Sequence, residues 1–344
     1  MVNDGELAKA RTLPASWYWT DEQHERERWS VFGREWLVAG PAASLDAPGR
    51  FAAVDVCGWP LLLVVGDDGG LRAFHNVCRH RAGPLAEGEG RCRALVCGYH
   101  GWTYDLDGRL RRPRDFGAAA DFDPADFALL PVQVGRWAGL VWVNLDLSAP
   151  PLAEALGGLP AACAAVDLDR LSFSHERSVE VACNWKTYAD NYMEGYHIPF
   201  VHPELNREVD ARRYRVDVED GYCRHSVPTR EGAVNAGTWL WRFPNIALNL
   251  YGDAMNVERF VPLGPRRTRV VYTYFFADRG PAAAARNEDV VRMSTVTLEQ
   301  DRRICEVVQR NLESGAYDTG RLSPRHENGV FHFQERVREA VARD

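Results

Sequence analysis

The sequence lacks long hydrophobic runs, an excess of positive charge and an N-terminal leader pattern. No apolar stretch approaches the roughly 18 residues of a membrane-spanning helix. Residues 1–12 contain no basic segment followed by an apolar one, so we expect no signal peptide. The net charge of -7 disfavours nucleic acid or an anionic membrane as a partner. These absences predict a soluble, cytoplasmic protein.

Cysteine is too sparse for a disulfide framework. The 344 residues include 8 cysteines, and a cytosolic chain of this size uses paired cysteines mainly as metal ligands. Hydrophobic residues make up 46% of the chain and aromatic residues 11%. This composition suits an enzyme with large pockets, folded as one large domain or two ordinary ones.

The hydrophobic pattern divides the chain into an N-terminal arm and helix at 1–35, a β domain at 36–148 and a second domain at 149–344. Short β-type runs separated by turn residues predict an antiparallel β structure for the first domain. In the second domain the patterns predict strands at 213–228, 237–250, 255–263 and 268–277, and helices at about 282–313 and near 333–341. The predicted fold class is α+β.

Two Cys–His pairs in the β domain have the spacing of a metal site. Cys78 pairs with His80, and Cys97 pairs with His100. Two thiolates and two imidazoles fit a Cys2His2 zinc site, or a Rieske [2Fe–2S] cluster in which the cysteines bind one iron and the histidines the other. Zinc fingers usually place both histidines on a helix, whereas here each cysteine leads its own histidine within a loop. This arrangement favours the cluster.

A second group of metal-type ligands lies in the segment NWKTYADNYMEGYHIPFVH. On a helix, Asn191, Glu194 and His197 would share one face. Pro199 would end that helix, and the next turn would bring His202 back toward His197. Two imidazoles and a carboxylate hold iron in non-heme Fe(II) oxygenases and leave positions open for O2. Taken alone, the segment fits a capped polar helix with two surface histidines equally well.

Together the two motifs resemble those of the α-subunit of Rieske non-heme iron oxygenases, the aromatic ring-hydroxylating dioxygenase family. The cluster motif matches at Cys78, His80, Cys97 and His100, its continuation GYHGW-Y--DG matches at 98–108, and the iron motif matches at Glu194, His197 and His202. The resemblance runs from about Leu13 to Val341. It implies an N-terminal Rieske [2Fe–2S] domain and a C-terminal helix-grip (START-like) domain that encloses a mononuclear iron.

The resemblance also implies that the third iron ligand comes from a late helix. Asp301 matches the aspartate of choline, betaine and carnitine oxygenases, while Glu299 and Glu306 remain alternatives. The family usually has an acid just before this aspartate, and this chain has Gln300.

The family further implies a homotrimer in which the cluster of one subunit faces the iron of the next. Glu194 matches the bridging carboxylate between the two centres, Asn191 supports the same site, and Asp190 is the competing bridge. Electrons would come from NAD(P)H through a flavin- or ferredoxin-type reductase.

The substrate is predicted from residues 238–276, which are similar to the sheet of the quaternary-ammonium branch. Trp239, Trp241, Phe243 and Tyr251 could line a cage for a trimethylammonium head through cation–π attraction. The first three alternate along one strand, so they fit a hydrophobic core equally well. We expect hydroxylation or oxidative demethylation of a quaternary or methylated amine. The alternatives are an aromatic ring-hydroxylating dioxygenase acting on an arene, and a non-catalytic Rieske electron carrier or zinc-stabilised binding protein.

Overall fold

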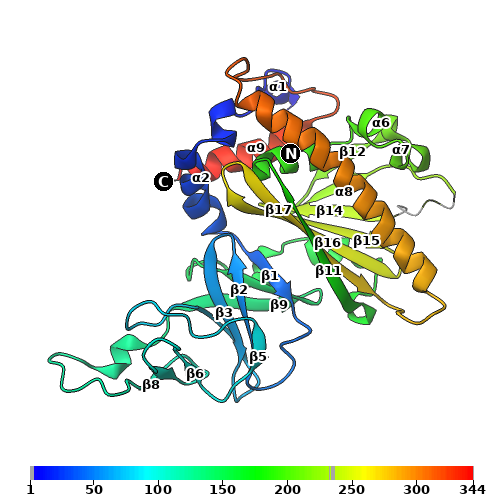
Figure 1. Cartoon of the computed structure of the whole chain (residues 1–344). Coiled ribbons are helices and arrows are strands. Elements are labelled where there is room, and N and C mark those ends of the chain that lie inside the picture. Colours follow the sequence, from blue (N-terminus) through cyan, green and yellow to red (C-terminus); the bar gives the residue numbers. More distant parts are fainter. Residues whose placement is uncertain (1–3, 232, 234–236, 344) are drawn as a thin grey trace. The chain divides into compact units, whose positions relative to one another are not determined.

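Figure 1 shows a computed structural model of the chain, which describes residues 4–231, 233 and 237–343. The chain divides into two compact units. One is formed by Arg34–Leu152, and the other by the chain on either side of it. Within the described residues, no helix is long and apolar enough to cross a membrane.

The unit formed by Arg34–Leu152 is an antiparallel β structure, as the sequence predicted. Its strands form one sheet in the order β1-β10-β9-β4-β3-β2-β5 and a smaller one in the order β6-β7-β8. Their bounds are β1 Leu37–Pro41, β2 Arg50–Val56, β3 Trp59–Val65, β4 Leu71–His75, β5 Glu89–Arg91, β6 Leu95–Val96, β7 Thr103–Tyr104, β8 Leu110–Arg112, β9 Pro131–Trp137 and β10 Leu140–Asn144, with the 3-10 helix η3 at Pro124–Phe127. The turn after β3 has Gly69 at φ +77°, a conformation that glycine adopts without strain.

The second unit contains an antiparallel sheet in the order β11-β17-β16-β15-β14-β13-β12. The strands are β11 Ser172–Val181, β12 Arg215–Val218, β13 Cys223–Ser226, β14 Thr238–Arg242, β15 Ile246–Tyr251, β16 Ala254–Gly264 and β17 Arg267–Phe276. The register places Asn249 opposite both Trp239 and Asn256. Because side chains alternate between the faces of a strand, these three lie on one face of the sheet.

Helices precede this sheet in the chain, follow it, and also lie between β11 and β12, which confirms the α+β class. They are α1 Asp4–Leu7, η1 Ala15–Tyr18, α2 Asp21–Glu27, η2 Arg28–Phe32, α3 Leu152–Ala155, α4 Leu159–Ala162, η4 Leu168–Arg170, α5 Trp185–Tyr192, α6 Ile198–Val201, α7 Leu205–Glu208, η5 Ala211–Arg213, α8 Ala284–Leu312 and α9 Asn328–Val341. The long helix α8 runs across the sheet in Figure 1. It buries Val290, Met293 and Leu298, whose spacing is that of one helix face.

A buried ion pair fixes the N-terminal segment to α5. Lys186 Nζ lies 2.7 Å from Glu27 Oε2, and both side chains are almost fully buried. Gln23 and Trp185 also donate to the Glu27 carboxylate, at 2.9 and 2.8 Å, and Lys186 donates to Asn184 Oδ1 at 2.8 Å. A buried ion pair is tolerated when such additional hydrogen bonds surround it. The pair therefore holds α5, the helix that leads into the candidate site.

Candidate functional site

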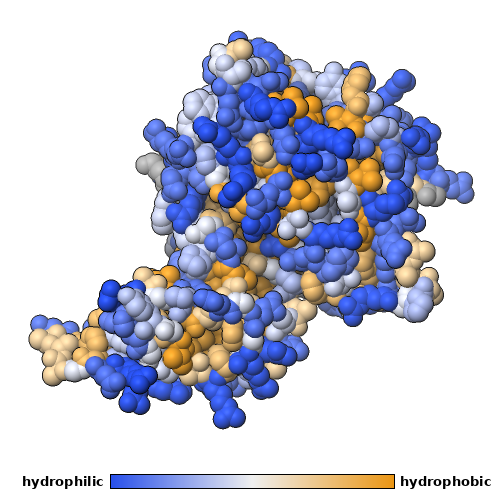
Figure 2. Space-filling view, in the orientation of Figure 1, coloured by the Kyte–Doolittle hydropathy of each residue, from blue (hydrophilic) through white to orange (hydrophobic). Residues whose placement is uncertain are grey.

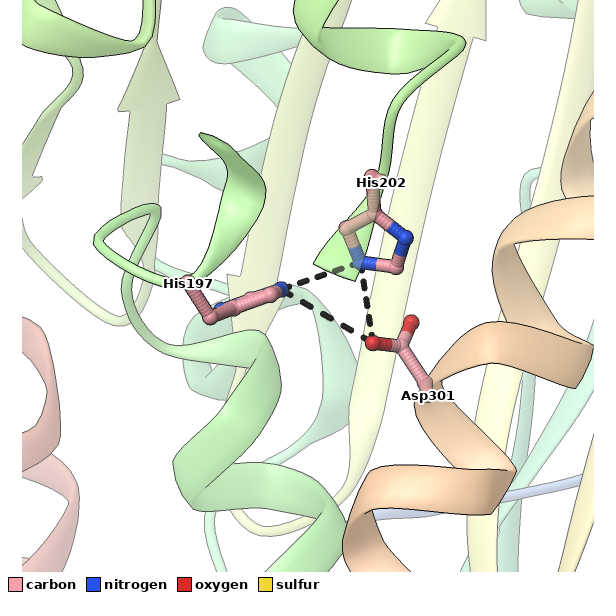
Figure 3. A group of neighbouring side chains, drawn as sticks. All are labelled: His197, His202 and Asp301. Atoms are coloured by element: carbon pink, nitrogen blue, oxygen red, sulfur yellow. Dashed lines mark hydrogen bonds and ion pairs between the residues drawn. The ribbon is translucent and has the colours of Figure 1, made fainter. Parts of the chain in front are cut away.

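Three side chains with metal-binding atoms converge in the second unit (Figure 3). His197 and His202 flank the short helix α6, and Asp301 lies on α8. His202 Nε2 lies 3.1 Å from His197 Nε2 and 3.0 Å from Asp301 Oδ1. His197 Nε2 lies 3.7 Å from the same oxygen. The three ligand atoms all lie within 4.8 Å of one another, as one bound ion requires.

The segment that carries these histidines is not one continuous helix, so that prediction is wrong. Helix α5 ends at Tyr192, and α6 begins after His197 with Pro199 in its first turn. The turn between the helices is closed by Glu194, whose Oε2 accepts the backbone N–H groups of Tyr196 and His197. Such bonds from a side chain to nearby backbone compete with helix formation. The break still brings the two histidines together.

Hydrogen bonds to acceptor oxygens fix the tautomer of both rings. His197 Nδ1 lies 2.5 Å from Glu194 Oε1, and His202 Nδ1 lies 2.7 Å from Gln300 Oε1. A carboxylate or amide oxygen only accepts, so each Nδ1 carries a proton, and each Nε2 would present its lone pair to a bound metal. Two lone pairs and the Asp301 carboxylate then face one another and repel unless a cation lies among them. The donor set therefore fits a divalent transition metal.

Asp301 is the acid of α8 that the structure brings to the histidines. Asn191 donates a 2.7 Å hydrogen bond to Asp301 Oδ1, which orients the carboxylate. The alternatives from the sequence lie elsewhere. Glu299 and Glu306 form ion pairs with Arg302, at 2.5 and 3.4 Å.

Asp190 is held away from the histidines. Its carboxylate accepts hydrogen bonds from Tyr18 Oη at 2.6 Å and from Gln334 Nε2 at 2.9 Å. Burial raises the pKa of Asp190 to about 7. Of the two acids considered for the bridge, Glu194 contacts a histidine of the site, whereas Asp190 links the N-terminal segment to α5 and α9.

The two Cys–His pairs lie in two loops of the first unit. The rings of His80 and His100 have centroids 4.6 Å apart, and His80 stacks on Trp102 at 4.8 Å. Cys78 and Cys97 are buried. His80 Nδ1 is also buried and finds no hydrogen-bond partner among the described residues. Buried polar atoms in native proteins are normally satisfied, so this nitrogen fits a metal ligand.

A glycine lies next to one cysteine sulfur, and a tyrosine hydroxyl lies within hydrogen-bond distance of the other. A Cβ at Gly83 would lie 2.9 Å from Cys97 Sγ, so a side chain there would fill this space. Tyr104 Oη accepts the backbone N–H of Arg79 at 3.0 Å and lies 3.3 Å from Cys78 Sγ. The hydroxyl proton is then available to the sulfur. This donor set fits a [2Fe–2S] cluster with cysteines on one iron and histidines on the other.

A cavity of about 100 Å³ adjoins His197, His202 and Asp301. Besides the site residues, including the acids Glu194 and Asp301, its lining includes five aromatic side chains and a further acid: Tyr192, Tyr214, Trp239, Tyr251, Tyr272 and Glu258.

Two of the four residues predicted for an aromatic cage line this cavity, namely Trp239 and Tyr251. Trp241 and Phe243 do not. Phe333 of α9 packs against Trp241 with ring centroids 5.6 Å apart, and Trp241 packs against Phe243 at 6.1 Å. The helix α9 thus covers this end of β14, and the two rings belong to the core.

The other aromatic lining residues and Glu258 were not predicted from the sequence. Tyr192 follows directly on Asn191 in the motif, and Tyr272 lies on β17 opposite Glu258 of β16. Glu258 is an acid within a strand, which is an uncommon place for one, but Asn256 and Arg259 in the same strand keep it from standing out in the sequence.

Each of the two candidate sites lies in a part of the chain that matches a known family model. A family model of the Rieske [2Fe-2S] domain matches residues 35–122, and a model of the ring hydroxylating alpha subunit (catalytic domain) matches residues 168–229 and 218–343. Chloroplastic choline monooxygenase of Beta vulgaris is 30% identical over 337 residues, which cover 94% of this chain and 76% of that protein.

Two further relatives agree with this match. The carnitine monooxygenase oxygenase subunit of Escherichia coli (strain K12) is 30% identical over 354 residues, covering 94% of this chain and 92% of that protein. The crystal structure of a quaternary ammonium Rieske monooxygenase in complex with L-carnitine superposes with a TM-score of 0.86 at 26% identity, covering 98% of this chain and 97% of that one.

Proposed function

The chain belongs to the ring-hydroxylating α-subunits of the Rieske non-heme iron oxygenases, and we propose that it hydroxylates or oxidatively demethylates a small quaternary or methylated ammonium compound. In this family the bound [2Fe–2S] cluster supplies single electrons, which originate from NAD(P)H and a reductase, and the mononuclear iron supplies the site where O2 is reduced.

We assign the ligands as follows. The cluster is held by Cys78, Cys97, His80 and His100, and the mononuclear iron by His197, His202 and Asp301. Glu194 and Gln300 keep the proton of each iron-binding histidine on Nδ1, which leaves Nε2 free to bind metal. Asn191 orients Asp301 through its 2.7 Å hydrogen bond.

The observation that carries the substrate proposal is the aromatic wall beside the three iron ligands. Trp239, Tyr251 and the other lining tyrosines present rings to the place where a substrate would approach. A well-placed ring contributes about 0.5–2 kcal/mol to the binding of a cation. A neutral arene would also stack on such rings, but the relatives described above are named for choline and carnitine.

A substrate panel with a reductase and NAD(P)H tests this proposal. Choline, glycine betaine, L-carnitine and γ-butyrobetaine form one arm, and naphthalene and indole form the other. We expect oxygen from isotopically labelled O2 in the product, or in the formaldehyde released by demethylation, only in the first arm. Turnover of arenes alone, to cis-diols or phenols, would establish the ring-hydroxylating alternative.

We further propose that the chain assembles as a homotrimer in which a neighbouring copy brings its cluster to Glu194. Glu194 lines both the substrate cavity and a second groove, of about 600 Å³, which is also lined by Ile304 and Val308 of α8. These two apolar side chains are 37% and 39% exposed. Figure 2 shows apolar side chains interrupting the hydrophilic surface of the second unit. A groove with apolar walls and a carboxylate shared with the iron site supports docking of a partner here.

A further inference from the structure

We propose that Glu258 supplies the negative charge that selects a cationic substrate in this cavity, an inference that rests on the proposed function. Glu258 lies in the middle of β16 and is 3% exposed. It lines the same cavity as His197, His202 and Asp301.

The carboxylate of Glu258 has hydroxyl partners but no cationic one. Tyr188 Oη donates to Glu258 Oε1 at 3.2 Å. Of the residues that the structure describes, no lysine, arginine or histidine forms an ion pair with Glu258. A buried carboxylate is normally paired with a positive charge, because burying it alone is costly. The missing positive charge is what a quaternary ammonium ligand carries into the cavity.

The surroundings of Glu258 suit a cation that cannot donate hydrogen bonds. A trimethylammonium head has no N–H group, so it is recognised through its charge and through the faces of aromatic rings. Tyr272 lies opposite Glu258 in the neighbouring strand, and Tyr192, Tyr251 and Trp239 line the same cavity. Glu258 and these rings therefore supply both kinds of attraction.

The positive charge of an occupied iron site would oppose the binding of a cationic substrate, and Glu258 can offset this. Two neutral imidazoles and the Asp301 carboxylate leave a divalent ion with a net positive charge, which repels a cationic substrate beside it. A second carboxylate on the cavity wall offsets that repulsion.

The charge of Glu258 depends on what occupies the cavity. Burial and the charge of Asp301 raise the pKa of Glu258, hydrogen bonds from Tyr272 and Tyr188 lower it, and the resulting pKa is about 8. At neutral pH the carboxyl of Glu258 is therefore mostly protonated while the cavity is empty. A cation in the cavity favours the ionised carboxylate.

A purely structural role for Glu258 would be to accept the hydrogen bond of Tyr188 and so connect α5 to the sheet. The variant Glu258→Gln separates the two roles, because the amide oxygen still accepts that hydrogen bond while the charge is removed. The matched control is Glu176→Gln. Glu176 accepts from Arg259 and Thr273, both at 2.6 Å, and lies on the opposite face of the same sheet.

The experiment is calorimetric titration of the holoenzyme with three probes: tetramethylammonium, choline, and the neutral tert-butyl analogue of choline, in which carbon replaces nitrogen. We expect wild-type protein and Glu176→Gln to bind both cations more tightly than the analogue. In Glu258→Gln, affinity for the cations should fall about tenfold or more, while affinity for the analogue stays the same or rises. The ratio of the two affinities is the readout, because a general folding defect lowers both.

Equal cation-to-analogue ratios in wild type and Glu258→Gln would overturn the inference, and so would a wild type that does not prefer the cations. A different result would refute the proposed reaction. A cation preference that depends on Glu258, in a protein that oxidises no amine of the substrate panel, would support the role of Glu258 and refute the proposed reaction.

Discussion

The amide oxygen of Gln300 lies 2.7 Å from Nδ1 of His202, whose Nε2 lies 3.0 Å from the carboxylate of the next residue, Asp301. Two consecutive side chains of α8 thus contact both nitrogens of one imidazole. Gln300, which stands where the family usually has an acid, is therefore the hydrogen-bond acceptor for a proposed iron ligand, His202. A neutral acceptor leaves the imidazole less electron-rich than a carboxylate does.

We first predict that position 300 tunes iron affinity through His202. Gln300→Leu should leave the Nδ1 proton without an acceptor and weaken iron binding about tenfold or more. Gln300→Glu should bind iron at least as tightly as wild type, because a carboxylate accepts the same proton and adds negative charge. The measurement is iron retained against a graded chelator. Equal retention by the leucine variant would show that the contact does not support the metal.

Asp301→Ala should remove the mononuclear iron and all turnover while leaving the visible spectrum of the cluster unchanged. The reason is that the carboxylate is one of three ligands, and the cluster ligands lie in the other unit. Glu299→Ala is the matched control on the same helix, since Glu299 only pairs with arginines. Iron analysis and turnover test this. Full iron content in Asp301→Ala would require a different third ligand.

The trimer proposal predicts complementation between two inactive variants. Cys78→Ser should lack the cluster, and His197→Ala should lack the mononuclear iron, so neither turns over alone. Mixed trimers of the two should regain part of the activity, because one variant keeps a cluster and its neighbour keeps iron. No activity in mixed trimers confirmed by light scattering would contradict electron transfer between subunits.

Tyr104→Phe should lower the reduction potential of the cluster, because hydrogen bonds to the sulfurs raise it. The hydroxyl lies 3.3 Å from Cys78 Sγ. A hydrogen bond worth about 0.5–1.5 kcal/mol corresponds to roughly 20–65 mV for a one-electron couple. Potentiometric titration of the visible spectrum measures the shift, with acid-labile sulfide as the control for cluster content. An unchanged potential would show that the hydroxyl does not stabilise the reduced cluster.

The raised pKa of Asp190 leads us to expect that the free energy of unfolding falls as pH rises. Its native pKa of about 7 exceeds the value of 3.8 for an ordinary aspartate, so the native state holds an extra proton between these two pH values. Stability is then lost across that window, at up to about 1.4 kcal/mol per pH unit from this group. Urea unfolding across the window should show a smaller slope for Asp190→Asn, which keeps an acceptor for Tyr18. An identical slope would assign the effect to other groups.

The proposed metal ligands could be proposed from the sequence because most of them are close in the chain. Cys78 and His80, or His197 and His202, need only a loop or a short turn to meet. Asp301 is about a hundred residues away and was found through the family resemblance. The domain boundaries expected near 36, 148 and 149 remain predictions.

The parts that were wrong depend on contacts that periodicity does not contain. Helix α5 ends at Tyr192 and does not continue to His197, because the Glu194 carboxylate accepts backbone hydrogen bonds from the following turn. These bonds compete with helix formation. Trp241 does not line the cavity, because Phe333 of α9 packs against it. The strand pattern groups Trp241 with Trp239, but it cannot show which part of a strand face a later helix covers.

The buried pair of Glu27 and Lys186 constrains the order in which the chain can fold during synthesis. These residues are 159 positions apart, and the β unit is encoded between them. A growing chain emerges N-terminus first, and domains generally fold as units as they emerge. The β unit can therefore fold on the ribosome before Lys186 has been synthesised, while Glu27 is still unpaired. The ion pair of Glu27 can form only after α5 has been translated.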